Sequence, residues 1–221
     1  MYGLADPLVL LNGAPPSKES WKGDTTTLIT SHHEKQLRDA ASNNSKMEWF
    51  NVNMLGLDGK VHPIFRDIST AEQVKKLYPV LKMLSGDYLT SDLKHRQGGG
   101  GSPSCRLCSF PVENLQHVLS CPATAEPRMR IQTELKDLLC ASTSNHAKTL
   151  SDNQFLDLVS DTKLFTQFCV DCTSFNLPEV YRINFNDDKV TKIFSVTRDL
   201  CYSVHTARLR LLKSQNISQG S

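Results

Sequence analysis

The sequence predicts a mostly α-helical protein, a helical domain organised around a small Cys-Cys-His-Cys zinc knuckle. Two observations carry this prediction. In several segments, apolar residues recur every three or four positions, which is the spacing of one helix face. Four potential metal ligands also fall between Cys105 and Cys121. The chain therefore divides into a helical region over residues 1–97, a glycine-rich loop over 98–104, the knuckle over 105–123 and a second helical region over 124–221.

The composition is that of a folded intracellular protein. Of the 221 residues, 39% are hydrophobic and 22% charged, proportions typical of a folded soluble chain. No apolar run approaches the roughly 18–20 residues that a membrane span needs, and the opening "MYGLADPLVLLNGAPP" lacks the basic flank of a signal peptide. Seven cysteines, an odd number, predict reduced thiols and a location in the nucleus and cytoplasm.

The first helix is expected to begin at Ser17, because Pro15 and Pro16 end the preceding segment and a serine is a good helix cap. Apolar residues then recur at helical spacing as far as the break "SNNS" at residues 42–45, and they are Trp21, Leu28, Ile29, Leu37 and Ala41. The state of residues 46–66 stays open, apart from a turn expected at Asp58-Gly59.

A second helix is predicted to start at a cap on Ser69 or Thr70 and to end at Gly86, with a bend or interruption at Pro79. Four consecutive glycines in "QGGGGSPS" then specify no regular structure. They predict a flexible loop between this helical region and the first cysteine of the knuckle.

Beyond the knuckle, "TAEPRMRIQTELKDLLCAS" predicts an amphipathic helix with Met129, Leu135, Leu138 and Leu139 facing inward. Two shorter helices are predicted in "SDNQFLDLVSD" and "TKLFTQFCVDCTSF". The longest periodic segment runs from Asp187 to about Lys213. Its apolar stripe consists of Val190, Ile193, Phe194, Leu200, Val204, Ala207 and Leu211.

The spacing Cys105-x2-Cys108-x8-His117-x3-Cys121 is typical of a structural zinc site. Two cysteines three apart can point inward from one turn, and His117 and Cys121 lie on one face of a helix turn. Three thiolates and one imidazole complete a tetrahedral shell with no position for a water, which disfavours hydrolytic chemistry. One structural Zn²⁺ is therefore expected, and buried thiols or a redox pair are the alternatives.

A second set, Cys169, Cys172, Cys201 and His205, would also offer three thiols and an imidazole if its helices packed together. These cysteines lie in apolar segments, and free cysteine is among the most buried residue types, so core packing is favoured. Cys140 has no obvious partner.

The knuckle and its flanks resemble the C-terminal segment of LINE-type (non-LTR) retrotransposon polyproteins, downstream of the reverse transcriptase. The matching positions are Lys82, Leu84, Gly86 and Tyr88 before the loop, then Cys105, Leu107, Cys108, Glu113, His117, Leu119, Cys121, Pro122 and Ala123. Residues 2–22 resemble the segment that follows the polymerase thumb, and "FTQFCVDCTSF" and "RDLCYSVHTARLRLL" resemble the extreme C-terminal end. The poly-Gly stretch departs from the family, whose members carry a variable polar loop there.

This resemblance implies a parent polyprotein with an endonuclease and a reverse transcriptase upstream, and neither is present in this chain. The stretch "FNDD", residues 185–188, has the form of a polymerase metal box. A helix is expected to begin at once after it, so Asp187 and Asp188 more simply cap that helix. A lone Asp187-x-Lys189 is a poor nuclease signature, and the segment is expected not to be an enzyme.

Binding is then the function that remains. Net charge is only +2, but residues 75–130 hold eight Lys or Arg against four acids, and residues 189–213 hold six against one. Candidate phosphate contacts are Lys94, Arg96, Arg106, Arg128, Arg130, Arg208, Arg210 and Lys213, and solvated helix faces are the plainer alternative. Tyr88 and Phe110 are candidates to stack on unpaired bases, with core packing as the alternative for each.

The resulting hypothesis is a nucleic-acid-binding zinc domain that grips template RNA, target DNA or both during target-primed reverse transcription, next to the upstream reverse transcriptase. The alternative is a structural or protein-interaction module, in which the zinc only braces helices against the polymerase or a host partner. Neither hypothesis involves a membrane or a small-molecule substrate.

Overall fold

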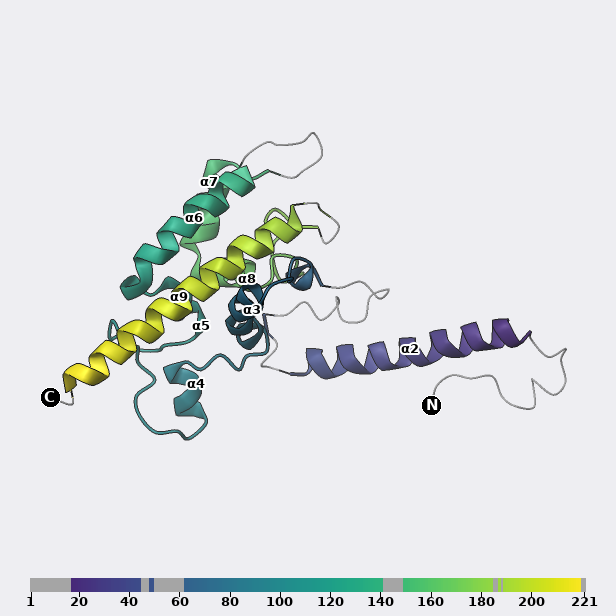
Figure 1. Ribbon diagram of the computed structural model, residues 1–221, viewed down its shortest axis with the longest axis horizontal. Helices are drawn as coiled ribbons and strands as arrows, with labels where there is room; N and C mark the ends of the chain where they lie inside the picture. Colours follow the sequence, from purple (N-terminus) through teal and green to yellow (C-terminus); the bar gives the residue numbers. More distant parts are fainter. Residues whose placement is uncertain are drawn as a thin grey trace. The chain divides into compact units, whose positions relative to one another are not determined.

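The computed structural model describes residues 17–44, 48–49, 62–140, 149–184, 187 and 189–219. All regular secondary structure in these residues is helical, which confirms the predicted fold class (Figure 1). The chain splits into two compact units. One contains residues 1–45 and 52–60, and the other contains residues 46–51 and 61–221. The predicted turn at Asp58-Gly59 lies outside the described residues.

The described part of the first unit is one helix, α2 (Lys18–Ser42). It starts where the sequence predicted, because the Ser17 hydroxyl accepts the Ser20 N–H at 3.1 Å and the Ser17 carbonyl accepts the Trp21 N–H at 2.9 Å.

The second unit begins with a short 3-10 turn, η3 (Pro63–Phe65), followed by α3 (Ala71–Leu84). Thr70 and Gln73 form a reciprocal capping box at the start of α3, and Pro79 lies inside the helix without ending it. The helix stops at Gly86, whose φ of 67° lets the Asp87 N–H turn back to the Lys82 carbonyl at 2.9 Å. The predicted end at Gly86 is therefore confirmed.

Small helices surround the cysteine cluster, and longer ones come after it. They are α4 (Ser91–Arg96), α5 (Leu115–Ser120), η4 (Pro122–Thr124), α6 (Ala125–Cys140), α7 (Asp152–Ser160), α8 (Thr162–Val170) and α9 (Val190–Gln219). Asp187 caps the last of these, since its carboxylate accepts the Lys189 N–H at 2.8 Å. The other three residues of "FNDD" lie outside the described residues.

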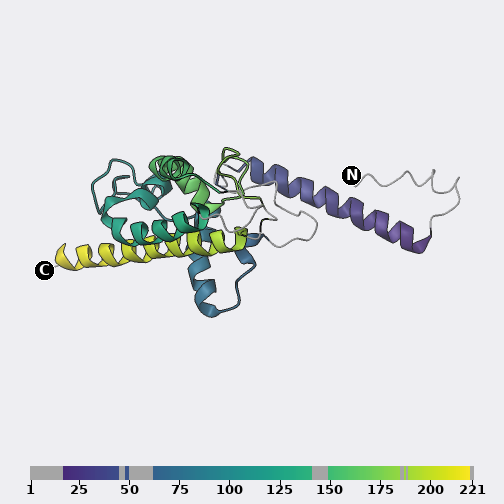
Figure 2. The same ribbon diagram turned by 90° about the horizontal axis from the view of Figure 1, so that it is seen from above.

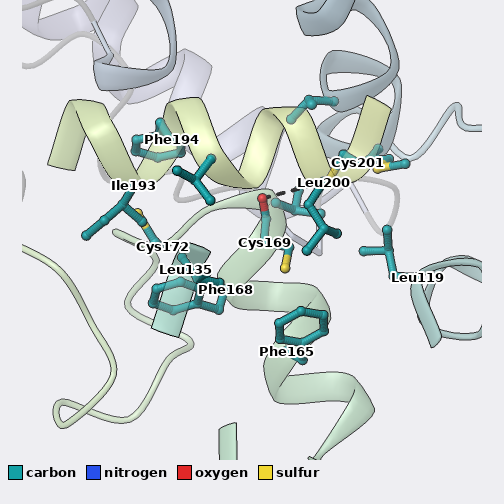
Figure 3. Close-up of a cluster of buried hydrophobic side chains, with 14 of the residues drawn as sticks. Leu119, Leu135, Phe165, Phe168, Cys169, Cys172, Ile193, Phe194, Leu200 and Cys201 are labelled. Carbon is teal, nitrogen blue, oxygen red and sulfur yellow. Dashed lines mark hydrogen bonds between the residues drawn. The ribbon is translucent and has the colours of Figure 1, made fainter. Parts of the chain in front are cut away.

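The core forms around α9, which packs against α3, α6 and α8 (Figures 1 and 2). The first two thirds of its predicted stripe are confirmed, because the side chains of Val190, Ile193, Phe194, Leu200 and Val204 are at most 1% exposed. Figure 3 shows aromatic rings of α8, Phe165 and Phe168, in the same cluster as Ile193 and Leu200.

The predicted inward face of α6 is partly wrong. Leu135 and Leu139 are buried and Leu138 packs against the core, but Met129 is 63% exposed. Six residues rotate a helix by about 600°, so Met129 lies about 120° away from Leu135. Ile131, four residues before Leu135, takes the inward position instead.

One ion pair between a buried arginine and a half-buried aspartate was not anticipated from the sequence. Arg198 of α9 is 2% exposed, and its guanidinium donates to both carboxylate oxygens of Asp67 at 2.9 and 2.7 Å. This pair fixes the segment after η3 to α9.

In the described part of the chain, no helix combines the length and apolar character needed to cross a membrane.

Candidate metal centre

Four potential ligand atoms meet in the knuckle, one each from Cys105, Cys108, His117 and Cys121, and all lie within 4.8 Å of one another. Cys121 Sγ is 3.9 Å from Cys105 Sγ and 3.7 Å from Cys108 Sγ. A zinc–sulfur bond of about 2.3 Å gives a tetrahedron with sulfur–sulfur edges of about 3.8 Å. The spacing of these thiols therefore fits one tetrahedral metal ion, and His117 Nε2, 3.2 Å from Cys108 Sγ, supplies the fourth donor.

The first two ligands come from a tight turn. The Cys105 N–H donates to the Phe110 carbonyl at 2.8 Å, and the Ser109 N–H donates back to the Cys105 carbonyl at 2.8 Å. Ser109 has a φ of 61°, in the left-handed region that lets the chain reverse within these few residues. The turn leaves Cys105 buried and Cys108 half-buried.

The last two ligands come from α5 and its end. The Asn114 side chain caps this helix by accepting the His117 N–H at 2.9 Å. Cys121 ends the helix four residues after His117, and Pro122 comes next. The predicted placement of His117 and Cys121 on one helix turn is therefore confirmed.

Burial favours the neutral forms of the free ligands. It raises the pKa of the Cys105 thiol to about 12, raises the pKa of Cys121 and lowers the pKa of His117. A bound cation would reverse this preference for the thiols, because metal ligation requires thiolates.

Phe110 and His117 form a parallel ring stack next to the ligands. Their centroids are 4.5 Å apart and the planes differ by 5°, yet Phe110 is 52% exposed. Of the two aromatic side chains predicted to stack on bases, only Phe110 is on the surface. Tyr88 is 7% exposed, and its hydroxyl lies 3.0 Å from His205 Nδ1, so the core-packing alternative holds for Tyr88.

A buried carboxylate inside the knuckle joins three parts of the chain. Glu113 is 1% exposed and accepts the N–H and the hydroxyl of Ser91, at 2.8 and 2.6 Å. It also accepts Nε and Nη2 of Arg208, at 3.0 and 2.8 Å. Burial alone would raise the pKa of Glu113, but the bonds from Arg208 and Ser91 outweigh it and the pKa is lowered. The start of α4, the knuckle and α9 are therefore tied at one ionised group.

Two further bonds connect the knuckle to the end of α9, and the Arg128 side chain bonds it to α6. Arg106 donates to the Asn216 side chain at 2.7 Å, and the Gln215 side chain donates to the Arg106 carbonyl at 3.1 Å. Arg128 donates to the carbonyls of Leu119 and Cys121 at 3.2 and 3.0 Å. The metal centre is therefore bonded to α4, α6 and α9.

The predicted phosphate-contacting residues separate into two groups. Arg128 and Arg208 are committed to the interior bonds just described, which corrects their assignment as surface contacts. The others are exposed, on elements bonded to the knuckle or in the knuckle itself, and they are Lys94, Arg96, Arg106, Arg130, Arg210 and Lys213. Among these, Arg96 also pairs with Asp92 at 3.0 Å, and Arg106 also donates to the Asn216 side chain at 2.7 Å.

The second cysteine set does not form a metal site in the described residues. Cys169, Cys172 and Cys201 are fully buried in the hydrophobic core (Figure 3), and burial raises the pKa of each. His205 faces Tyr88 instead. Core packing, the favoured interpretation of this set, is what the structure shows.

Sequence reasoning missed the roles of Ser91, Asn216 and the inward orientation of Arg208. Their partners are 22 to 110 residues away in the chain, and no local pattern marks such pairs. Glu113 did carry a signal, because it stood among the motif residues of the resemblance.

No protein-family model, curated protein or solved structure matches this chain. The geometry of the metal centre and of the surface around it is therefore the basis for a function.

Proposed function

We propose that this chain is a non-catalytic, zinc-organised nucleic-acid-binding module. It lies beside a reverse transcriptase and grips template RNA or target DNA during target-primed reverse transcription. Its Cys3His ligand set suits zinc, because soft thiolates with one imidazole in a tetrahedral array are typical of structural zinc sites. With four protein ligands the shell has no open position, so the zinc builds shape and activates no water.

The observation that carries the proposal is a group of exposed cations on the elements that build the knuckle or are bonded to it, hereafter the cation set: Lys94, Arg96, Arg106, Arg130, Arg210 and Lys213. They come from three helices and one turn, and each of these elements is bonded to the knuckle or belongs to it. Phosphate contacts supply most of the affinity of such surfaces. The metal centre would therefore gather, from distant parts of the sequence, the charges that a nucleic-acid backbone requires.

The resemblance to the LINE-type segment supports the setting. A reverse transcriptase of that type must hold its RNA near a nicked target whose DNA end primes synthesis. A zinc domain next to the polymerase is suited to that task, in the nucleus or the cytoplasm.

The proposal is tested by measuring binding of a labelled RNA from the element's 3′ end, and of a target duplex, between 50 and 200 mM salt. Affinity should fall steeply with salt, and Arg106→Ala with Arg130→Ala should lower the logarithmic salt slope by about one for each phosphate that is no longer bound. Lys163→Ala, an exposed cation outside the cation set, is the matched control. Binding that is insensitive to salt and to both arginines would overturn the proposal.

The alternative module, one that docks on the polymerase, has one observation in its favour. A hollow of about 400 Å³ on α3 and η3 is lined by Ile64, Phe65, Tyr78, Leu81, Lys82, Leu84 and Ser85. Tyr78 is 61% exposed and Val74, one turn earlier, is 56% exposed. An apolar helix face of the upstream polymerase is the occupant that this candidate requires. Loss of polymerase binding on Tyr78→Asp, with RNA binding by the isolated chain absent, would favour it.

A further inference from the structure

We infer that Phe110, backed by the imidazole of His117, is a stacking platform for one unpaired nucleobase. This inference rests on the proposed function and narrows its ligand to single-stranded nucleic acid. The geometry behind it is specific. The Phe110 ring lies parallel to a metal-ligand ring at 4.5 Å, and yet 52% of the residue remains exposed.

The position of Phe110 is fixed from two sides. Its carbonyl accepts the Cys105 N–H at 2.8 Å, so its backbone belongs to the ligand turn. Its ring rests on His117, whose Nε2 is 3.2 Å from Cys108 Sγ and takes part in the donor set. A metal bound at Nε2 would fix the plane of the imidazole and, through it, the plane of the Phe110 ring. Such a ring is pre-organised, so a ligand that stacks on it loses little entropy in ordering it.

An unpaired nucleobase is the ligand that this surface suits. Every base offers a flat π-face to an aromatic ring, and the adjacent sugar-phosphate carries the negative charge that cations attract. Arg106 is exposed and lies in the same ligand turn, next to Cys105. Inside a duplex both faces of each base are already covered by neighbouring pairs, so only the two end pairs of a duplex have a free base face. The platform therefore predicts a preference for single strands.

A plainer role for Phe110 is to shield the metal ligands from water. The two roles differ in what a substitution changes. If Phe110 only shields the ligands, its substitution should weaken metal retention and should reduce the binding of single strands and duplexes equally. If Phe110 stacks on a base, its substitution should weaken single-strand binding while the metal stays bound.

The experiment compares a labelled single-stranded 12-mer with a blunt duplex of the same sequence, using the full chain loaded with Co²⁺ so that its absorption reports an intact site. Phe110→Leu should weaken single-strand binding about tenfold, the loss of one base–aromatic stack, with duplex binding unchanged. Phe110→Trp should restore it, and in the zinc-loaded variant the added tryptophan emission, taken as the difference from the unsubstituted chain with its own Trp21 and Trp49, should be quenched at saturating oligonucleotide. Val112→Ala is the matched control, an exposed apolar residue two positions away and 39% exposed.

Equal losses for single strand and duplex, or no loss on Phe110→Leu, would overturn the platform. Should Phe110→Leu also lose the cobalt bands, Phe110→Trp decides alone, and absence of quenching at saturation would overturn the inference. Failure of the proposed function looks different. In that case the unsubstituted chain binds neither oligonucleotide in a salt-dependent manner.

Discussion

Glu113 and Arg208 form a two-pronged ion pair across 95 residues of sequence, with Arg208 Nε 3.0 Å from Oε1 and Nη2 2.8 Å from Oε2 of the carboxylate. The side chains are 2% and 11% exposed. Because Glu113 lies between the two ligand pairs of the metal centre, this pair connects the folding of the knuckle to the position of α9. It also explains why Arg208 is unavailable to phosphate.

Replacing Glu113 by Gln should destabilise the protein strongly. The substitution leaves the Arg208 guanidinium buried without a counter-charge, and breaking a buried pair in this way costs about 3 kcal/mol or more. Urea unfolding at neutral pH with zinc present measures the change. Asp92→Asn is the matched control, because its partner Arg96 has a side chain that is 65% exposed, and the loss should stay below about 1 kcal/mol. Equal losses for the two variants would contradict the role given to Glu113.

Because of the ion pair between Asp67 and Arg198, the free energy of unfolding should fall in acidic solution. Burial alone would raise the pKa of Asp67, but the bonds and charge of Arg198 outweigh it and the pKa is lowered. A carboxyl with a lowered folded-state pKa contributes its stability above its unfolded pKa of about 3.9 and loses it as pH falls through the lower folded value.

Asp67→Asn should therefore cost about 2–4 kcal/mol at pH 7. The difference between the two proteins should be constant from pH 7 to about pH 5 and should shrink in more acidic solution. Thermal unfolding at several pH values measures it, and acid release of the metal affects both proteins alike. A difference that grows on acidification would contradict the assignment.

Sequence and structure agree where the deciding interactions are local. The caps at Ser17, Thr70 and Asp187, the stop at Gly86 and the four-ligand spacing each depend on atoms within a few residues, so the pattern contains the answer. The prediction of an inward Met129 is wrong, because the phase of the helix stripe set by Leu135 and Leu139 turns this residue outward.

The local sequence does not predict which arginines of α9 point into the interior. Arg198 and Arg208 stand in the same basic segment as Arg210, and their sequence context is alike. The first two point inward because Asp67 and Glu113, 131 and 95 residues away, receive them there. The folded structure is therefore needed to distinguish arginines that are paired in the interior from those that are exposed and can bind a ligand.

The core cysteines should be separable from the metal ligands by substitution. Cys172→Ser places a hydroxyl in a fully buried apolar site and should cost about 1–3 kcal/mol. The variant should still bind one equivalent of zinc. Cys108→Ser, at a half-buried position, should instead lose tight zinc binding with little packing cost. Metal analysis after gel filtration decides, and a fall from two equivalents to one on Cys172→Ser would indicate a second site.

Zinc binding should release protons and tighten steeply as pH rises. Without metal, burial raises the pKa of Cys105 to about 12 and also raises the pKa of Cys121, so both thiols hold their protons at neutral pH. Zinc requires both as thiolates, and each displaced proton adds about one logarithmic unit of apparent affinity per pH unit. Strong chelation at constant pH should remove the metal and, with it, the fold of the knuckle, measured by loss of protection of the Cys105 and His117 amides from hydrogen exchange.

Competition with a chelator of known pH dependence, between pH 6.5 and 7.5, should therefore give a slope of two or more for the logarithm of zinc affinity against pH. A slope near zero would mean that these thiols do not bind the metal.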